Sequence, residues 1–154
     1  MKNTTTVERR SARELVVTRT FNGPAHLVFK AWTQPELFVR WWVPGSVGLN
    51  LLSWEMDVRV GGGYRLVFAG NPEPMAFFGK YLEVTPHSRL SWSNDESPEG
   101  PITTVIFEES GGKTLATLTD LYPSKEVLDA AITADSTGAF PEQFEQLDEL
   151  LISL

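Results

Sequence analysis

The residues of this chain that could carry out chemistry are few and widely spaced. Its 154 residues include two histidines, His26 and His87, and no cysteine. Two imidazoles with no third ligand at metal-binding spacing do not predict a metal site or a histidine-centred triad. The absence of cysteine excludes a disulfide, a thiolate ligand and a cysteine nucleophile. We therefore expect no metal, no cofactor and no catalytic residue.

The charged and glycine-rich motifs have structural explanations. Asp57 and Arg59 stand two positions apart on a predicted strand, so their side chains share one face and can form an ion pair. The run Gly61-Gly62-Gly63 precedes a strand rather than a helix, which predicts a tight hairpin and not a phosphate-binding loop. Polar contacts that orient a ligand could come from Tyr64, Tyr81, Tyr122, Glu55 and Arg65.

Aromatic side chains are the more informative set. Five Trp and nine Phe are a large aromatic content for a chain of this length. They could fill a solid core or line a hollow one, and the pattern leaves both open. If the core is hollow, we predict a ligand cavity lined by Trp32, Trp41, Trp54, Met56, Tyr64, Phe68, Phe77, Tyr81, Trp92, Phe140 and Phe144.

The charge balance limits the possible partners. A formal charge of −7 disfavours nucleic acids and anionic membrane surfaces, because both would repel the protein. A neutral, apolar or cationic small molecule is the better expectation. The polar N-terminus lacks the apolar stretch of a signal peptide, and no run approaches transmembrane length, so we expect a cytoplasmic protein.

The first half of the chain predicts one strand and two short helices. Residues 1–12 are predicted to be a flexible tail, and residues 13–154 a single domain that begins with a strand over 14–21. Pro24 suits the first turn of a helix that continues to Trp32. Thr33-Gln-Pro-Glu36 matches a capping box and predicts a second helix that ends near Trp42.

The second half predicts an antiparallel meander followed by helices. Six strands separated by short turns are expected at 51–58, 62–70, 75–85, 89–94, 101–109 and 113–121. Ser124 can cap a short helix. A last helix over 140–154 carries an apolar seam (Phe140, Phe144, Leu147, Leu151, Leu154) opposite four acidic residues (Glu142, Glu145, Asp148, Glu149). The expected fold is an α+β helix-grip, in which a curved antiparallel sheet of about seven strands wraps around the C-terminal helix.

Four stretches of the chain carry a family resemblance. They are RTFNGPA (19–25) with VFKAW (28–32), RWWVP (40–44), DVRVGG (57–62), and GKYLEVTP (79–86) followed by RLSW (89–92). In this order they resemble the START-like (SRPBCC) superfamily, and within it the homologues of the heat-shock-protein ATPase activator. The resemblance covers residues 14–152.

The resemblance implies a helix-grip fold whose cavity often holds hydrophobic small molecules. It does not imply one function, because members of one fold can serve as carriers, cyclases or co-chaperone domains. Family members commonly carry Gly-Trp at the start of the last helix, where this chain has Ala139-Phe140 followed by Pro141. We therefore expect a differently shaped helix entry and pocket floor.

Three hypotheses follow. The leading one is a noncatalytic protein that binds a hydrophobic or aromatic small molecule, lipids included, between the sheet and the C-terminal helix. The second is an enzyme of the same fold, a cyclase or hydrolase-like protein that uses a cavity Tyr, Glu or Asp. The third is a protein-interaction or stress-related co-chaperone-like module, with exposed strand edges that would also permit a homodimer.

Overall fold

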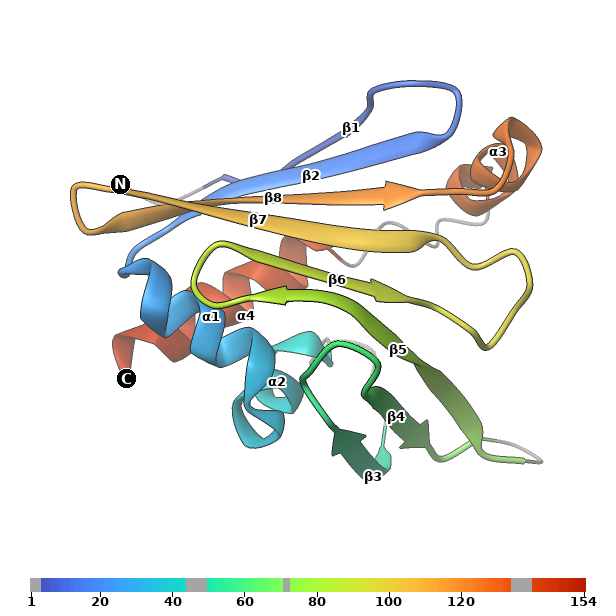
Figure 1. The fold of residues 1–154 in the computed structure, drawn as a ribbon, viewed down its shortest axis with the longest axis horizontal. Coiled ribbons are helices and arrows are strands. Elements are labelled where there is room, and N and C mark those ends of the chain that lie inside the picture. Colours follow the sequence, from blue (N-terminus) through green and yellow to red (C-terminus); the bar gives the residue numbers. More distant parts are fainter. Residues whose placement is uncertain (1–3, 44–49, 71–72, 134–139) are drawn as a thin grey trace.

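One curved sheet organises the molecule. A computed structural model describes residues 4–43, 50–70, 73–133 and 140–154, and within these ranges eight antiparallel strands run in the order β1-β2-β8-β7-β6-β5-β4-β3 (Figure 1). The strands are β1 Thr6–Arg9, β2 Glu14–Phe21, β3 Leu51–Met56, β4 Gly63–Phe68, β5 Met75–Thr85, β6 Arg89–Ser93, β7 Ile102–Ser110 and β8 Lys113–Leu121. The helices are α1 Ala25–Thr33, α2 Pro35–Trp42, α3 Lys125–Thr133 and α4 Phe140–Ile152.

Local sequence explains why the central strands form. Along β8 the even-numbered residues from Thr114 to Asp120 are all buried, while their odd-numbered neighbours are exposed or half-buried, the period of two expected of a strand with one covered face. Gly111 and Gly112 join β7 to β8 with φ values of 60° and 78°, a conformation that glycine adopts without the strain of a Cβ.

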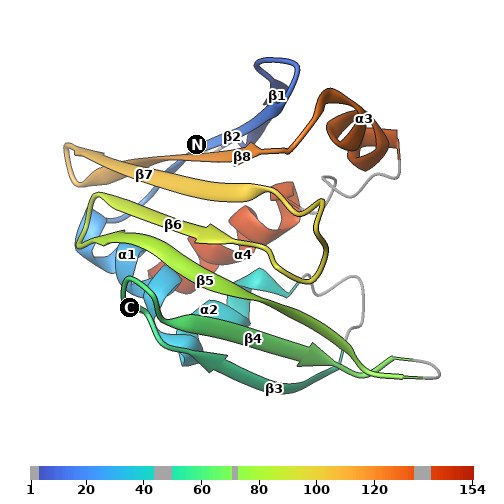
Figure 2. The ribbon, with the colours of Figure 1, turned by 45° about the vertical axis from the view of Figure 1, so that its right-hand side comes forward.

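Three helices cover the inner face of the sheet. Figures 1 and 2 show α1, α2 and α4 on the same side, whereas α3 lies apart, beyond the end of β8. The core is formed where these helices meet the sheet, and Trp32, Trp41, Phe21 and Phe144 are its largest fully buried side chains. No helix in the described part of the chain is long and apolar enough to cross a bilayer. The structure thus has the predicted helix-grip fold.

The sheet contains one strand more than the sequence predicts. Strand β1 pairs with β2 from Thr6↔Thr18 to Arg9↔Leu15, inside the segment 1–12 that we expected to be a flexible tail. All four of its residues are exposed, so β1 has no buried face and lacks the apolar alternation by which strands are recognised. The remaining strands match the predicted ones within two residues at each end.

The predicted capping box is wrong. Thr33 belongs to the last turn of α1, where its hydroxyl donates a hydrogen bond to the carbonyl oxygen of Phe29 at 2.9 Å. The N-cap of α2 is Gln34, which makes no side-chain capping bond. Pro35 explains the shift, because the residue before a proline is driven into the extended conformation that Gln34 adopts.

The C-terminal helix differs from the prediction at two positions. Phe144, Leu147 and Leu151 are buried as expected, but Leu154 lies beyond the end of α4 and is 41% exposed. Asp148 does not face solvent, since its carboxylate forms an ion pair with Arg19 of β2 at 2.9 Å and the two side chains are 12% and 4% exposed. The helix is therefore held to the sheet by a charge pair as well as by its apolar seam.

Candidate ligand-binding pocket

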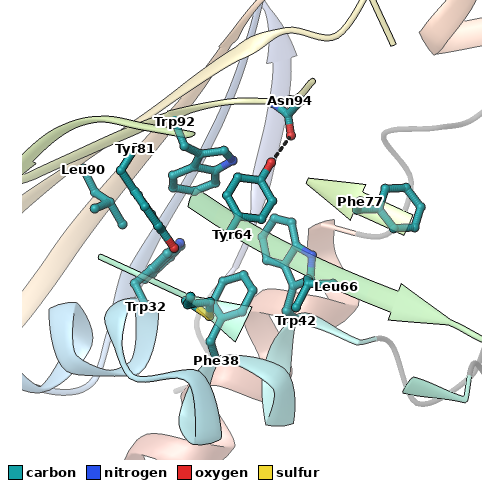
Figure 3. Close-up of a pocket in the computed structure, with 11 residues that line it drawn as sticks. Trp32, Phe38, Trp42, Tyr64, Leu66, Phe77, Tyr81, Leu90, Trp92 and Asn94 are labelled. Atoms are coloured by element: carbon teal, nitrogen blue, oxygen red, sulfur yellow. Dashed lines mark hydrogen bonds between the residues drawn. The ribbon is translucent and has the colours of Figure 1, made fainter. Parts of the chain in front are cut away.

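A pocket of about 80 Å³ lies between the inner face of strands β3 to β6 and the helices α1 and α2 (Figure 3). Apart from Asn94 and the two tyrosine hydroxyls, the lining is aromatic or aliphatic. The described residues that line it are Trp32, Phe38, Trp42, Met56, Tyr64, Leu66, Phe77, Tyr81, Leu90, Trp92 and Asn94.

Strand register brings these side chains to one face. Leu66 of β4 stands opposite Phe77 of β5, and Tyr81 of β5 stands opposite Trp92 of β6. Residues directly opposite one another in an antiparallel pair point to the same side of the sheet. The meander therefore collects residues from four strands on the surface that α2 faces.

Gly79 provides the space that the ring of Tyr64 needs. It stands opposite Tyr64 in the register, and a Cβ on it would come within 1.9 Å of the Ser93 carbonyl oxygen and 2.9 Å of a Tyr64 ring carbon. Because no side chain stands there, the Tyr64 hydroxyl reaches across β5 to the end of β6. It can donate to the Ser93 carbonyl oxygen at 2.8 Å or to Oδ1 of Asn94 at 3.2 Å.

Two glutamines of α4 fix the end of α2 that bears the pocket residues. Gln143 Nε2 donates to the carbonyl oxygen of Trp42 at 2.5 Å, and Gln146 Nε2 donates to those of Trp41 and Val43, both at 2.9 Å. The last carbonyl groups of a helix have no partner inside the helix, so these side chains satisfy what would otherwise be unpaired acceptors. The orientation of Trp41 and Trp42 thus depends on α4.

Ring contacts complete the wall formed by the helices. Trp32 meets Trp41 edge-on at 4.6 Å between ring centroids, and Phe38 stacks on Trp42 at 5.0 Å with 23° between the planes. Trp42 then meets Trp92 of the sheet at 6.5 Å. These are favoured aromatic geometries, each worth about 0.5–1.5 kcal/mol beyond area burial.

A hydrogen-bond chain leads from the pocket into the sheet. Asn94 Nδ2 donates to Oγ1 of Thr103 at 3.0 Å and to the carbonyl oxygen of Pro101 at 2.7 Å. The Thr103 hydroxyl in turn donates to Oδ1 of Asp120 at 2.5 Å. Tyr64 is thereby connected to a buried carboxylate that does not itself line the pocket.

Burial sets the protonation state of these groups. It raises the pKa values of the Tyr64 and Tyr81 hydroxyls well above 10, so both phenols are neutral at pH 7. Burial also raises the pKa of Asp120 to about 6, although the hydrogen bond from Thr103 opposes this shift. The pocket presents neutral donors and no ionised group among its described lining residues.

Six of the eleven predicted cavity residues line this pocket: Trp32, Met56, Tyr64, Phe77, Tyr81 and Trp92. Trp41, Phe68 and Phe144 instead belong to the packed core, with exposed fractions of 0–4%. Phe140 is half-buried against Phe144. Trp54 stands opposite Leu66 on the same face but lies on the edge strand β3, where it is 42% exposed.

The pocket differs in position from the expected cavity. We expected it between the sheet and the C-terminal helix, but no described residue of α4 lines it. The apolar face of α4 is occupied by other contacts, since Phe144 packs against Phe21 at 5.4 Å and against Trp32 at 5.7 Å. Ala139, where we expected an altered helix entry, lies outside the described residues.

Sequence reasoning missed Phe38, Trp42, Leu66, Leu90 and Asn94. Leu66 could have been found, because it alternates with Tyr64 along a strand whose Tyr was already placed in the cavity. Trp42 could not have been found. Helix α2 has only about two turns, so its sequence does not define which of the adjacent residues Trp41 and Trp42 faces the pocket. Asn94 could not have been found either, because it is polar and follows the end of β6, outside the apolar pattern that predicts pocket residues.

The other candidate residues lie elsewhere. Arg59 and Asp57 form the expected ion pair at 2.8 Å, exposed on the hairpin that Gly61 and its neighbours make between β3 and β4. Tyr122 packs in a second cluster with Leu15 and Leu128. Glu55 and Arg65 lie across from each other on the outer face of the sheet, away from the pocket.

The two histidines are exposed and lie close together. The ring of His87 lies 6.4 Å from that of His26 and 5.7 Å from that of Phe29. Within the described ranges no group of three or more His, Cys, Asp or Glu side chains could hold a metal ion. The pair therefore has no third ligand there.

The fold is an α+β helix-grip, and the family match identifies the chain as a START-like (SRPBCC) homologue. The chain belongs to the family of Activator of Hsp90 ATPase homolog 1-like proteins, whose family model matches residues 22–152. No curated protein matches the chain.

Solved structures show the same fold. A protein of Rhodobacter sphaeroides is 22% identical with a TM-score of 0.86, and the alignment covers 97% of this chain and 99% of that one. A protein of Nitrosomonas europaea is 22% identical with a TM-score of 0.83, and the alignment covers 94% of this chain and 97% of that one. A protein of Staphylococcus epidermidis is 25% identical with a TM-score of 0.79, and the alignment covers 96% of this chain and 94% of that one.

Proposed function

We propose that the protein binds a hydrophobic or aromatic small molecule in the pocket between the sheet and helices α1 and α2. The observation that carries this proposal is an apolar space of about 80 Å³ inside an otherwise tightly packed aromatic core. Protein interiors contain few voids larger than a water molecule. A ligand in this space would remove the apolar lining from water, which is worth about 25 cal/mol per Å² of area buried.

The pocket can admit larger occupants only at its open side. Phe77 is 41% exposed and Met56 is half-buried, whereas Leu66 and Leu90 at the inner end are 2% and 0% exposed. An apolar cavity of about 150 Å³ accommodates benzene. A ligand of two or more rings would therefore displace the side chains of Phe77 and Met56 outward.

The chemistry of the lining favours binding over catalysis. Its described residues include no Asp, Glu, Lys, Arg or His, and its two tyrosines hold their protons because burial raises their pKa values. A general base must hold an acceptor within hydrogen-bond reach of its substrate. The buried carboxylate of Asp120 is separated from the pocket by Thr103 and Asn94.

The family match favours a second candidate, a protein-interaction module of the co-chaperone type, because the family is named after an activator of the Hsp90 ATPase. Leu52 and Trp54 on the edge strand β3 are 52% and 42% exposed and could dock a partner or a second copy of the chain. Sedimentation analysis tests self-association, and a monomer at micromolar concentration would contradict the homodimer.

A direct test looks for a ligand and then blocks the site. Native mass spectrometry of freshly purified protein should reveal a bound small molecule, or a thermal-shift screen of neutral aromatic and aliphatic compounds should find ligands that raise the Tm. Leu66→Trp adds an indole to the pocket and should abolish both effects. The proposal fails if no compound binds, or if Leu66→Trp binds as the unmodified protein does.

Val67→Trp is the matched control for this variant. Val67 adjoins Leu66 on β4 but points to the opposite face of the sheet, where it is half-buried. The substitution adds the same ring outside the pocket, so binding should persist. Circular dichroism of both variants checks that each keeps the fold.

A further inference from the structure

The pocket contains hydrogen-bond donors that the protein leaves without acceptors. Nε1 of Trp32 is buried, and no described residue accepts a hydrogen bond from it. The hydroxyl of Tyr81 lies in the same pocket and forms no hydrogen bond with another described residue, but of the two groups only Trp32 Nε1 is fully buried. In Figure 3 the ring nitrogen of Trp32 and the hydroxyl of Tyr81 both point toward the middle of the pocket.

An unpaired buried donor requires an explanation. Leaving such a group without a partner costs about 1–3 kcal/mol, and most buried polar groups in folded proteins are paired. Tyr64 shows how the same sheet treats a phenol that it does satisfy, since its hydroxyl has acceptors on Ser93 and Asn94.

The lining also restricts the charge of a ligand. No Lys, Arg or His is among the described lining residues, so a carboxylate or phosphate would lose its water without gaining a cation. A neutral acceptor such as a carbonyl oxygen loses much less on transfer into an apolar site. The free polar groups therefore match a ligand that accepts hydrogen bonds and carries no charge.

We propose that the pocket recognises neutral, flat, apolar compounds through a carbonyl-type oxygen that accepts hydrogen bonds from Trp32 Nε1 and the Tyr81 hydroxyl. This inference rests on the proposed function and specifies its ligand class. The surrounding rings bind the apolar body of the ligand, and the two donors fix its orientation. A hydrocarbon of equal shape would bind more weakly because it leaves both donors unpaired.

Two small probes of nearly identical shape test the inference. 1-Indanone carries one carbonyl oxygen, and indane is the same bicycle without it. We expect 1-indanone to bind about fivefold to a hundredfold more tightly than indane, the range of two net hydrogen bonds. Indane-1-carboxylate should bind more weakly than either. Titration with detection by protein NMR measures all three affinities on the intact chain.

The indole N–H signal of Trp32 gives a readout that affinity alone does not. On binding 1-indanone this proton should move downfield, because it acquires an acceptor, whereas indane should leave it near its starting position. Trp32→Phe identifies the signal by its disappearance. Tyr81→Phe, which removes only the hydroxyl, should weaken binding of 1-indanone about three- to tenfold and leave that of indane unchanged, because Trp32 still donates.

Tyr122→Phe is the matched control, because it removes a buried hydroxyl outside the pocket. It should leave the preference for 1-indanone unchanged. Equal binding of 1-indanone and indane with no separate shift of the Trp32 signal would overturn the inference while leaving the proposed binding function intact. If neither probe binds and the compound screen also fails, both proposals are overturned.

Discussion

The hydroxyl of Thr103 donates a hydrogen bond of 2.5 Å to the carboxylate of Asp120 inside the sheet, where the two residues are 4% and 6% exposed. They stand opposite each other on β7 and β8. Since no cation is paired with Asp120 among the described residues, this hydrogen bond is its principal support. This hydrogen bond does not fully replace the hydration that the carboxylate loses on burial, and burial therefore raises the pKa of Asp120 to about 6.

The first prediction concerns the pH dependence of stability. The pKa of Asp120 is about 6 in the folded state and about 3.9 in the unfolded state. Between these two pH values, Asp120 is protonated in the folded protein and ionised in the unfolded chain. Its contribution to the free energy of unfolding therefore falls as pH rises from about 4 to 6, and is constant above that. Asp120→Asn removes this loss and should stabilise the protein at pH 7 by up to about 3 kcal/mol.

Urea unfolding of both proteins between pH 4 and 8 checks this prediction. The advantage of Asp120→Asn should be smallest at pH 4, grow toward pH 6 and then stay level. Comparing the two curves cancels the other carboxylates, such as Glu14 and Asp129, whose pKa values are lowered mainly by side-chain hydrogen bonds. A variant that is less stable than the unmodified protein at pH 7 would show that Asp120 is stabilising in its ionised form.

A second prediction concerns the ion pair that joins α4 to β2. Arg19 and Asp148 are 4% and 12% exposed, and Asp148 also accepts a hydrogen bond from the backbone N–H of Asn22. Arg19→Leu leaves the carboxylate of Asp148 without its cation in a poorly hydrated place. Breaking such a pair by removing one partner costs about 3–5 kcal/mol.

The exposed pair Arg59–Asp57 provides the comparison, because its side chains are 75% and 54% exposed. Arg59→Leu should change the free energy of unfolding by less than about 1 kcal/mol. Chemical denaturation measures both variants. Similar losses in the two would mean that burial does not distinguish the pairs.

A third prediction tests the close approach at Gly79. Gly79→Ala would place a Cβ against the Ser93 carbonyl oxygen and the Tyr64 ring, so the backbone of β5 must move. We expect a loss of more than about 2 kcal/mol, above the average of about 1 kcal/mol for a single substitution. Gly111→Ala is the reference, since nothing lies within 4 Å there and only the strain of φ +60° remains. Thermal unfolding should show the larger decrease in Tm for Gly79→Ala.

The sequence predicts the strands well because their signals are local. The ends of β5 and β8 agree with the predicted 75–85 and 113–121, where turn residues flank β-rich runs. What it does not predict depends on contacts between distant residues. From the sequence alone, Asp148 is predicted to face solvent, because its partner Arg19 lies 129 positions away in the chain. Trp42 rather than Trp41 enters the pocket, a choice that Gln143 and Gln146 help to fix.

The final prediction tests how α4 holds the pocket wall. Gln146 donates to the carbonyl oxygens of Trp41 and Val43, at the end of α2 where unpaired carbonyl groups carry partial negative charge. Gln146→Glu keeps the size of the side chain but replaces its donor with a carboxylate that these oxygens repel. We expect a loss of about 2 kcal/mol, the sum of a lost hydrogen bond and the unfavourable helix-end charge. Gln34→Glu makes the same substitution at an exposed residue that is both the C-cap of α1 and the N-cap of α2, so the two helix ends oppose each other and the effect should be less than about 0.5 kcal/mol. Urea unfolding at pH 7 compares the two, and equal effects would show that Gln146 acts through bulk rather than through its hydrogen bonds.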